Sequence, residues 1–326
     1  MERVESGVRR TGQGGAGIMK PSFRYIPHDQ LDKKRWDETL GRCVNAMPYA
    51  QSYFLDTVCP GWNALVYGDY EALFPFPTGK KAWIGYSFTP PFVQQLGLFS
   101  PINPTSSQTD DVLRLCTEHA LWIDLKMNHG HQQLSDAIVQ RWNRNLVLDL
   151  SPSYDEVRKK YSTNLTRNIK KGKKNNIRIS TGNDIKPVIA LFRSDRGKNI
   201  DGMDDRAYDL LARLYDKALA HGQSQLLLAA TEDGKTIAGA FFLKWKDRHV
   251  LMFTGNSTEG KTLGAMPFLI DHHISQNAGQ QGCLLDFEGS NDDNLARFYG
   301  SFGAEEERYA TIRINHLPWW ARIWKG

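Results

Sequence analysis

The chain has 326 residues, of which 40% are hydrophobic and 24% are charged, a globular composition with room for about two domains. No run of about 18 apolar residues occurs, which excludes a membrane-spanning helix. Four scattered cysteines (Cys43, Cys59, Cys116 and Cys283) exclude a disulfide framework, so we expect reduced thiols in a cytoplasmic protein.

The first 150 residues predict a flexible tail and one domain. Residues 1–20 hold five glycines and no apolar core, which indicates a tail rather than a signal peptide. The Thr78-Gly79-Lys80 sequence predicts a turn. Within 21–150, strands are expected at 23–26, 64–67, 71–75, 82–84, 94–99 and 146–150, and helices at 31–44 and 109–127.

Residues 151–326 predict a second domain, which opens with a helix from Ser153 to Asn175. Ser153 and Glu156 have the spacing of a capping box, and apolar residues recur every fourth position from Val157 to Ile169. Asp233-Gly234 predicts a hairpin between two apolar strands. Further helices are expected at 186–192, 206–220, 265–276 and 292–301, strands at 177–180, 225–231, 236–245, 249–253, 283–287 and 307–315, and a loop at 254–264.

Positive charge is concentrated on the first helix of this domain. Residues 154–178 hold nine Lys or Arg and two Asp or Glu, whereas the whole chain has a net charge of only +5. Arg167, Lys171 and Lys174 fall on one helical face and could contact the phosphates of a nucleotide-linked or tRNA-linked substrate. The alternative is a solvated charged face. No zinc-finger or RNP motif occurs, so we expect no DNA partner.

The order of elements in the second half resembles the GNAT acyltransferase fold. Asp286-Phe287-Glu288-Gly289-Ser290, the Phe298-Tyr299 helix and Pro91–Gly97 are similar to sequences of the FemAB-like branch, whose members carry two GNAT-like halves in tandem. The resemblance covers residues 21 to about 315. It implies an α/β (α+β) fold of two tandem GNAT-like domains, each with a mixed, mostly antiparallel sheet flanked by helices.

A donor site is expected where the loop meets the helix at Ala265. Backbone N–H groups at a helix N-terminus can cradle phosphate. The GNAT pattern is Gln/Arg-x-x-Gly-x-Gly/Ala, and alignment on Gly264 puts Lys261 first and Met266 last. The alternative is a turn whose glycines permit positive φ. The predicted donor-binding residues are Thr254, Gly260, Lys261, Thr262, Gly264 and Ala265.

Three residues are candidates for catalysis. The resemblance implies that Tyr299 protonates the leaving thiolate, and a tyrosine near its ordinary pKa of about 10 can donate a proton at neutral pH. Asp286 and Glu288 lie two apart in a strand and share one face, where they could accept an amine proton or bind an ammonium group. The alternatives are a core tyrosine and a carboxylate that caps the next helix.

Two further features carry weaker hypotheses. His129, His131, His272 and His273 have no carboxylate or cysteine partner at ligand spacing, so we expect no metal site. The segment 317–325 is rich in tryptophan and ends in lysine, which suits either a membrane-surface anchor or docking onto the protein itself.

The sequence therefore predicts an N-acyl or aminoacyl transferase with a small-molecule or peptide-like amine acceptor. The co-substrate would be acyl-CoA or aminoacyl-tRNA, with no tightly bound cofactor. We expect one donor site, in the second half, and an acceptor groove shaped by the first half. The alternative is a catalytically inactive protein of the same fold that binds an anionic ligand or RNA.

Overall fold

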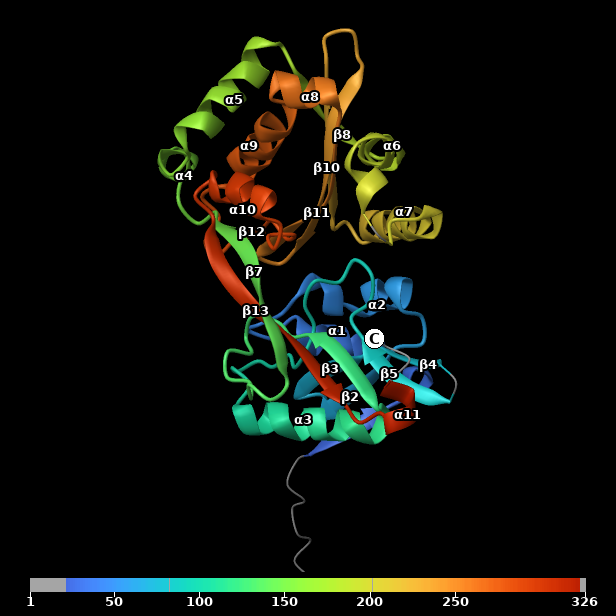
Figure 1. The fold of residues 1–326 in the computed structure, drawn as a ribbon. Helices are drawn as coiled ribbons and strands as arrows, with labels where there is room; N and C mark the ends of the chain where they lie inside the picture. The colour runs from blue at the N-terminus through green and yellow to red at the C-terminus, as the bar shows by residue number, and fades with distance from the viewer. Residues whose placement is uncertain (1–21, 82, 201, 323–326) are drawn as a thin grey trace, which may run out of the picture.

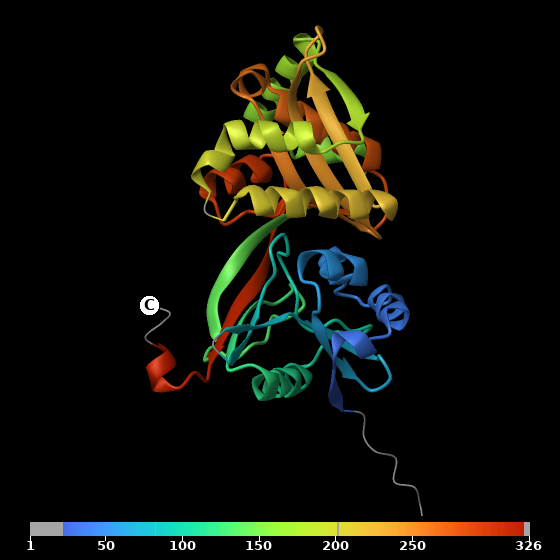
Figure 2. The same cartoon turned by 90° about the vertical axis from the view of Figure 1, so that its right-hand side faces the viewer.

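The computed structural model describes residues 22–322 except Ala82 and Asp201, and it has the mixed α/β architecture that the sequence predicts. Figures 1 and 2 show one body from each half of the chain, joined by the long strands β7 (Val139–Asp149) and β13 (Glu305–Asn315). The predicted tail at 1–20 lies outside the described residues. None of the helices that the structure describes is long and apolar enough to span a bilayer.

The first half contains a three-stranded antiparallel sheet, in the order β1-β2-β3, and one end of a ten-stranded sheet. Its strands are β1 (Phe23–Ile26), β2 (Asn63–Tyr67), β3 (Ala72–Phe76), β4 (Thr78–Lys81), β5 (Ile84–Phe88), β6 (Trp122–Lys126) and β7. Its helices are α1 (Lys33–Leu40), α2 (Ser52–Val58) and α3 (Ser106–His119), with short 3-10 turns at His28–Gln30 and Pro48–Ala50.

The second half contributes the other strands of the large sheet and most of the helices. Its strands are β8 (Arg178–Gly182), β9 (Ser224–Ala230), β10 (Thr236–Trp245), β11 (Arg248–Asn256), β12 (Leu284–Asp286) and β13. Its helices are α4 (Tyr154–Lys159), α5 (Thr163–Lys174), α6 (Lys186–Ser194), α7 (Asp205–Ala220), α8 (Thr258–Leu263), α9 (Ala265–Asn277), α10 (Asp293–Gly300) and α11 (Trp319–Arg322), with a 3-10 turn at Arg196–Asn199.

The large sheet runs through both halves in the order β4-β5-β6-β13-β7-β12-β11-β10-β9-β8. Strand β13 pairs with β7 from Glu305 to Ile312 and with β6 from Thr311 to Asn315. The last strand of the chain therefore completes the sheet of the first half. Strand β7 also pairs with β12, which joins the second-half strands to the same sheet.

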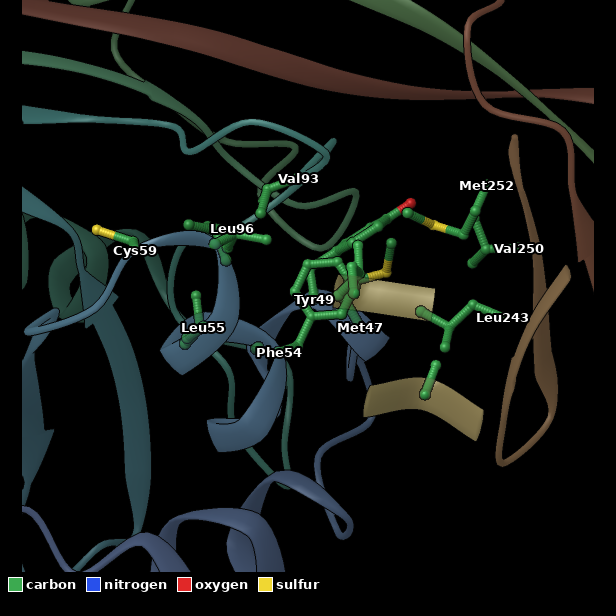
Figure 3. Close-up of a cluster of buried hydrophobic side chains, with 14 of the residues drawn as sticks. Met47, Tyr49, Phe54, Leu55, Cys59, Val93, Leu96, Leu243, Val250 and Met252 are labelled. Carbon is green, nitrogen blue, oxygen red and sulfur yellow. The ribbon is translucent and has the colours of Figure 1, made fainter. Parts of the chain in front are cut away.

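Helices cover both faces of the second-half strands. Figure 1 shows α5 and α9 on one side of β8, β10 and β11, with α6 and α7 on the other. The core on the α6 and α7 side continues into the first half, because α7 packs against α2. In Figure 3, Met47 and Tyr49 of the first half face Leu243, Val250 and Met252 of the second. This shared apolar core fixes how the two halves meet.

Four predicted elements of the first half are wrong, and one of them is the strand predicted at 82–84, because Trp83 lies in the turn between β4 and β5. The helix predicted over 109–127 is helix α3 followed by strand β6, because Ile123 and Leu125 alternate with Asp124 in the period of a strand. The turn predicted at 78–80 is strand β4, and the chain reverses after Lys81. The strand predicted at 94–99 forms only isolated bridges, because Gly97 has φ +103° and breaks the extended chain.

Two predicted elements of the second half are also corrected. The long helix at 153–175 is two helices, because Ser162 caps α5 by accepting a 3.2 Å hydrogen bond from the N–H of Leu165. The loop at 254–264 is the end of β11 followed by helix α8, which Ser257 caps by accepting a 2.9 Å bond from the N–H of Gly260. The capping box at Ser153 and Glu156 is confirmed.

Candidate functional site

Strands β11 and β12 pair for a short distance and then separate. They are parallel neighbours over only three positions, Arg248 to Val250 opposite Leu284 to Asp286. Strand β11 continues to Asn256, paired with β10 on its other side, whereas the chain leaves β12 for helix α10. The two strands therefore open into a wedge at this end of the sheet.

A cavity of about 510 Å³ fills this wedge, and we call it the wedge pocket. It brings together three residues that the sequence predicted for the site: Thr254 at the end of β11, Lys261 of α8 and Tyr299 of α10. The predicted donor residues Gly260, Thr262, Gly264 and Ala265 do not line it. The full lining is Phe192, Asp195, Arg196, Thr254, Asn256, Lys261, Met266, Pro267, Ile270, Leu295, Phe298 and Tyr299.

The wall of the wedge pocket carries charges suited to an anionic ligand. Lys261 lies 2.5 Å from Asp195, and Arg196 lies 2.9 Å from Asp292. Both pairs are partly exposed, so a phosphate could displace either carboxylate at little cost. The buried side-chain oxygen of Asn256 has no hydrogen-bond partner among the described residues. A buried acceptor without a donor fits a ligand that supplies an N–H group.

Tyr299 closes the pocket from helix α10. It is 6% exposed, and its ring stacks on Phe287 with 4.7 Å between ring centroids. Burial raises the pKa of Tyr299, and the nearby charge of Glu288 raises it further. Its hydroxyl donates no hydrogen bond to the residues that the structure describes. Tyr299 is thus a protonated group at neutral pH with a proton free for a ligand.

The structure separates the roles of the two predicted carboxylates. Asp286 is fully buried and accepts bonds from Arg248 Nε at 2.8 Å, Asn145 Nδ2 at 3.0 Å and the N–H of Glu288 at 3.0 Å. Its oxygen atoms are therefore occupied within the protein. Glu288 follows the end of β12 with φ +48°, a conformation that is strained for a residue other than glycine.

Glu288 has the properties of a general base. Its carboxylate accepts a short hydrogen bond from the hydroxyl of Tyr49, which comes from the first half of the chain. Burial, together with the negative charge of Asp286, raises the pKa of Glu288 to about 8. A base with a pKa near the working pH is well matched to removing a proton from an amine.

A second cavity lies on the first-half side of the sheet. It has a volume of about 460 Å³ and is lined by Tyr86, Phe88, Thr89, Trp122, Asp124, Lys126 and Arg313. Burial lowers the pKa of Lys126, and the opposing effect of Glu288 shows that the two charges sense each other. We call this cavity the first-half pocket, and Lys126 on its wall is the lining residue that senses the charge of Glu288.

The segment that carries most of the wedge pocket matches a known family. Residues 159–295 match the acetyltransferase (GNAT) domain. This segment is similar to the GNAT acetyltransferase domain, as the resemblance implied. GNAT proteins transfer acyl groups and use acyl-CoA as co-substrate, which is the activity that the resemblance implied.

Solved structures confirm the predicted fold. FemX aligns with a TM-score of 0.63 at 12% identity, over 89% of this chain and 97% of FemX. The C-terminal domain of a "putative lysylphosphatidylglycerol synthetase" from Agrobacterium fabrum aligns with a TM-score of 0.50 at 13% identity, over 87% of this chain and 92% of that chain. No curated protein matches the chain.

The glycines of this GNAT domain serve close packing. Gly264 joins α8 to α9 with φ +77°, and a Cβ there would clash with the carbonyl oxygen of Asn168 in α5. A Cβ on Gly172 of α5 would lie 3.1 Å from the carbonyl oxygen of Gly264. A Cβ on Gly260 would clash with Asn256 and Ile237. These contacts require glycine whether or not a ligand binds.

Replacing Gly264 by Ala should lower the free energy of unfolding by about 3 kcal/mol, because strain at positive φ adds to a backbone clash. Gly279 is a matched control: it has φ +84° but nothing within 4 Å of the position that a Cβ would occupy, so Gly279→Ala should cost only about 1–2 kcal/mol. Urea unfolding of both variants measures the difference. If Gly264→Ala and Gly279→Ala lower the free energy of unfolding by the same amount, α5 does not approach Gly264 closely.

The basic helix lies outside the wedge pocket. Arg167, Lys171 and Lys174 are exposed on α5, whose apolar side packs against α9. Figure 1 shows α5 across α9 from the sheet. If these three residues contact a substrate, as the sequence predicts, they contact a part of it that extends beyond the wedge pocket.

Sequence reasoning missed several residues of this region, among them Arg248, Tyr49 and Lys126. Arg248 is 8% exposed and bridges Asp286, at 2.7 Å, and Glu307. Tyr49 and Lys126 belong to the first half and reach Glu288 only through the fold. The one available signal was Arg248 at the start of an apolar strand. A charge buried there needs a partner of opposite charge, which would have pointed to a nearby carboxylate.

Proposed function

We propose that the protein is an N-acyltransferase that moves an acyl group from acyl-CoA to an amine, with its donor in the wedge pocket. The observation that carries this proposal is the pocket between β11 and β12, where Thr254 and Lys261, of the segment that matches the GNAT domain, meet Tyr299. Residues 151–326 would hold the donor, and residues 21–150 would shape the acceptor side. The four buried, unpaired cysteines suit a reducing compartment, and we place the reaction in the cytoplasm.

The donor would bind along the mouth of the wedge pocket. Lys261 and Arg196 would exchange their aspartate partners for phosphate oxygens, and Asn256 would accept an amide N–H of the donor. The apolar side chains of Met266, Ile270 and others would surround the acyl-bearing arm. Thr254 and Tyr299 would then lie beside the thioester.

The transfer would use Glu288 and Tyr299 as base and acid. The amine nitrogen attacks the thioester carbon, and Glu288 accepts the proton that the nitrogen loses. The C–S bond then breaks, and the thiolate takes the hydroxyl proton of Tyr299, which solvent replaces. The raised pKa of Tyr299 keeps its hydroxyl protonated, as the acid step requires, whereas Glu288, with a pKa raised to about 8, becomes the required base as the pH rises toward 8.

The acceptor would be a small-molecule or peptide-like amine that approaches from the first half. Tyr49 orients Glu288 from that side, and Lys126 joins Glu288 to the first-half pocket. An aminoacyl-tRNA could replace acyl-CoA as donor, because the exposed cations of α5 would meet an RNA backbone beyond the pocket.

Replacing Tyr299 by Phe should lower kcat by about 100-fold and leave the KM for acetyl-CoA unchanged, since only the proton donor is lost. Thiol release from acetyl-CoA with a panel of amines measures both constants. Tyr154→Phe is the control, because this hydroxyl bonds Asp271 on the far side of α9. Full activity in Tyr299→Phe would remove the acid role.

The same assay distinguishes the donors and the inactive alternative. Thiol release with acetyl-CoA or a longer acyl-CoA supports the proposal. Turnover only with aminoacyl-tRNA would show that the donor is aminoacyl-tRNA and not acyl-CoA. If no donor raises the melting temperature and no transfer occurs, the protein is a binding protein of the GNAT fold.

A further inference from the structure

Four large apolar side chains are exposed at one end of the ten-stranded sheet. Trp83, in the turn between β4 and β5, is 100% exposed, and Leu121, just before β6, is 39% exposed. Trp319 and Trp320, in α11 after β13, are 76% and 54% exposed. Leu317 is buried, so the C-terminal segment docks through Leu317 and leaves both tryptophans in solvent.

Backbone hydrogen bonds hold these segments side by side. The N–H of Leu121 donates to the carbonyl of Gly85 at 2.9 Å, and the carbonyl of Leu121 accepts from the N–H of His316 at 2.8 Å. The sheet order β5-β6-β13 gives the same arrangement. In Figure 1, α11 lies beside β4 and β5. We call the surface formed by Trp83, Leu121, Trp319 and Trp320 the tryptophan edge.

The backbone of Trp83 is held in an unusual conformation. Its φ is +70°, which is strained for an aromatic residue, yet the side chain makes no packing contact that would offset the strain. Strain of this kind recurs at functional positions. The two-residue turn between Lys81 and Ile84 favours this positive φ, and it presents the whole indole to solvent.

The tryptophan edge is flanked by positive charge. Lys80 and Lys81 of β4 are exposed, and no carboxylate among the described residues forms an ion pair with them. Two acidic residues of the flanking elements have cationic partners: Glu118 pairs with Arg114 at 3.6 Å, and Asp124 with Arg313 at 2.7 Å. The edge is apolar at its centre and basic at its border.

We propose that the tryptophan edge binds the surface of a membrane that contains anionic lipids. Indole rings partition to the boundary between lipid headgroups and acyl chains, and lysines beside them gain from anionic headgroups. The side chains project from a turn and a short helix and line neither of the pockets described above, so they suit a broad surface better than a peptide groove. This proposal does not depend on the acyltransferase mechanism.

Membrane contact would also place one pocket at the lipid surface. Trp122, which follows Leu121 directly, lines the first-half pocket. An acceptor amine carried at the membrane surface would therefore have the shortest route to this pocket.

Vesicle flotation with the full chain tests the proposal. We expect the wild type to float with vesicles of phosphatidylcholine and phosphatidylglycerol and to stay unbound with phosphatidylcholine alone. The triple variant Trp83→Ser, Trp319→Ser, Trp320→Ser should lose at least about tenfold in affinity. Lys80→Glu with Lys81→Glu should weaken binding to the charged vesicles, and the loss should shrink at high salt.

Two controls separate the tryptophan edge from other surfaces. Trp142→Ser removes a tryptophan that is 37% exposed on β7 and should leave flotation unchanged. The variant Lys171→Glu with Lys174→Glu tests whether the basic helix α5 binds the vesicles instead. If this variant loses flotation while the tryptophan variant keeps it, that result would overturn the proposal. So would a wild type that never floats, or one that forms a dimer which the tryptophan variant abolishes.

Discussion

Replacing Glu288 by Gln should lower kcat/KM for the amine by at least about 100-fold at pH 7.5, because the amide cannot accept the proton. Thiol release under subsaturating amine measures the loss. In the wild type, kcat/KM should rise about tenfold per pH unit as pH increases toward 8 and level off above it, because burial and Asp286 raise the pKa of Glu288 to about 8. Full activity in Glu288→Gln would remove its role as base.

The pH profile needs a control, because the acceptor amine also titrates. The hydroxyl of Tyr49 donates to Glu288 and lowers its pKa, opposing the larger effect of burial. Tyr49→Phe should therefore move the inflection to higher pH, whereas the pKa of the free amine cannot change. Tyr53→Phe is the matched control, because this neighbouring hydroxyl bonds Gln223 at 2.8 Å instead. An inflection that stays in place in Tyr49→Phe would assign it to the acceptor.

Replacing Arg248 by Met should destabilise the protein by about 3–5 kcal/mol, the cost of leaving a buried charge without its partner. Arg248 is 8% exposed and neutralises Asp286 and Glu307. Urea unfolding measures the change. The control is Arg193→Met, which breaks a 2.7 Å pair with Asp205 at side-chain exposures of 51% and 81% and should cost about 1 kcal/mol or less.

The cost of Arg248→Met should also depend on pH. Burial alone would raise the pKa of Glu307, but in the wild type Arg248 more than offsets this effect and the pKa is lowered. Glu307 therefore contributes stability above its unfolded pKa, and the contribution is lost as pH falls. In the variant a proton can neutralise the carboxylate of Glu307, so the difference in stability from wild type should shrink as the pH falls from 7 to 5. A cost no larger than that of Arg193→Met would show that Arg248 is not needed.

The elements that the sequence predicts best are those with local signals. The Asp233-Gly234 hairpin fixes β9 and β10, and the apolar run after Gly264 fixes α9. Tyr299 reaches the wedge pocket because the helix that carries it follows β12 closely in the chain. Each of these inferences needs only neighbouring residues.

Other features depend on contacts between distant parts of the chain. Tyr49 meets Glu288 across 239 positions, and no pattern around Pro48–Ala50 indicates such a contact. Strand β13 shows a clear alternation, but its pairing with both β6 and β7 comes only from the fold. The sequence predicts a phosphate loop at Gly260 and Gly264, whereas in the structure both glycines allow close packing. A phosphate loop and a close helix crossing both favour glycine, so the sequence pattern is the same for both.

The most direct test of this account is a structure of the protein with acetyl-CoA. We expect the phosphates beside Lys261 and Arg196, an amide N–H of the donor at Asn256, and the thioester sulfur next to the hydroxyl of Tyr299. Glu288 should face the carbonyl carbon from the first-half side. A donor bound elsewhere on the protein, with the wedge pocket empty, would contradict the account.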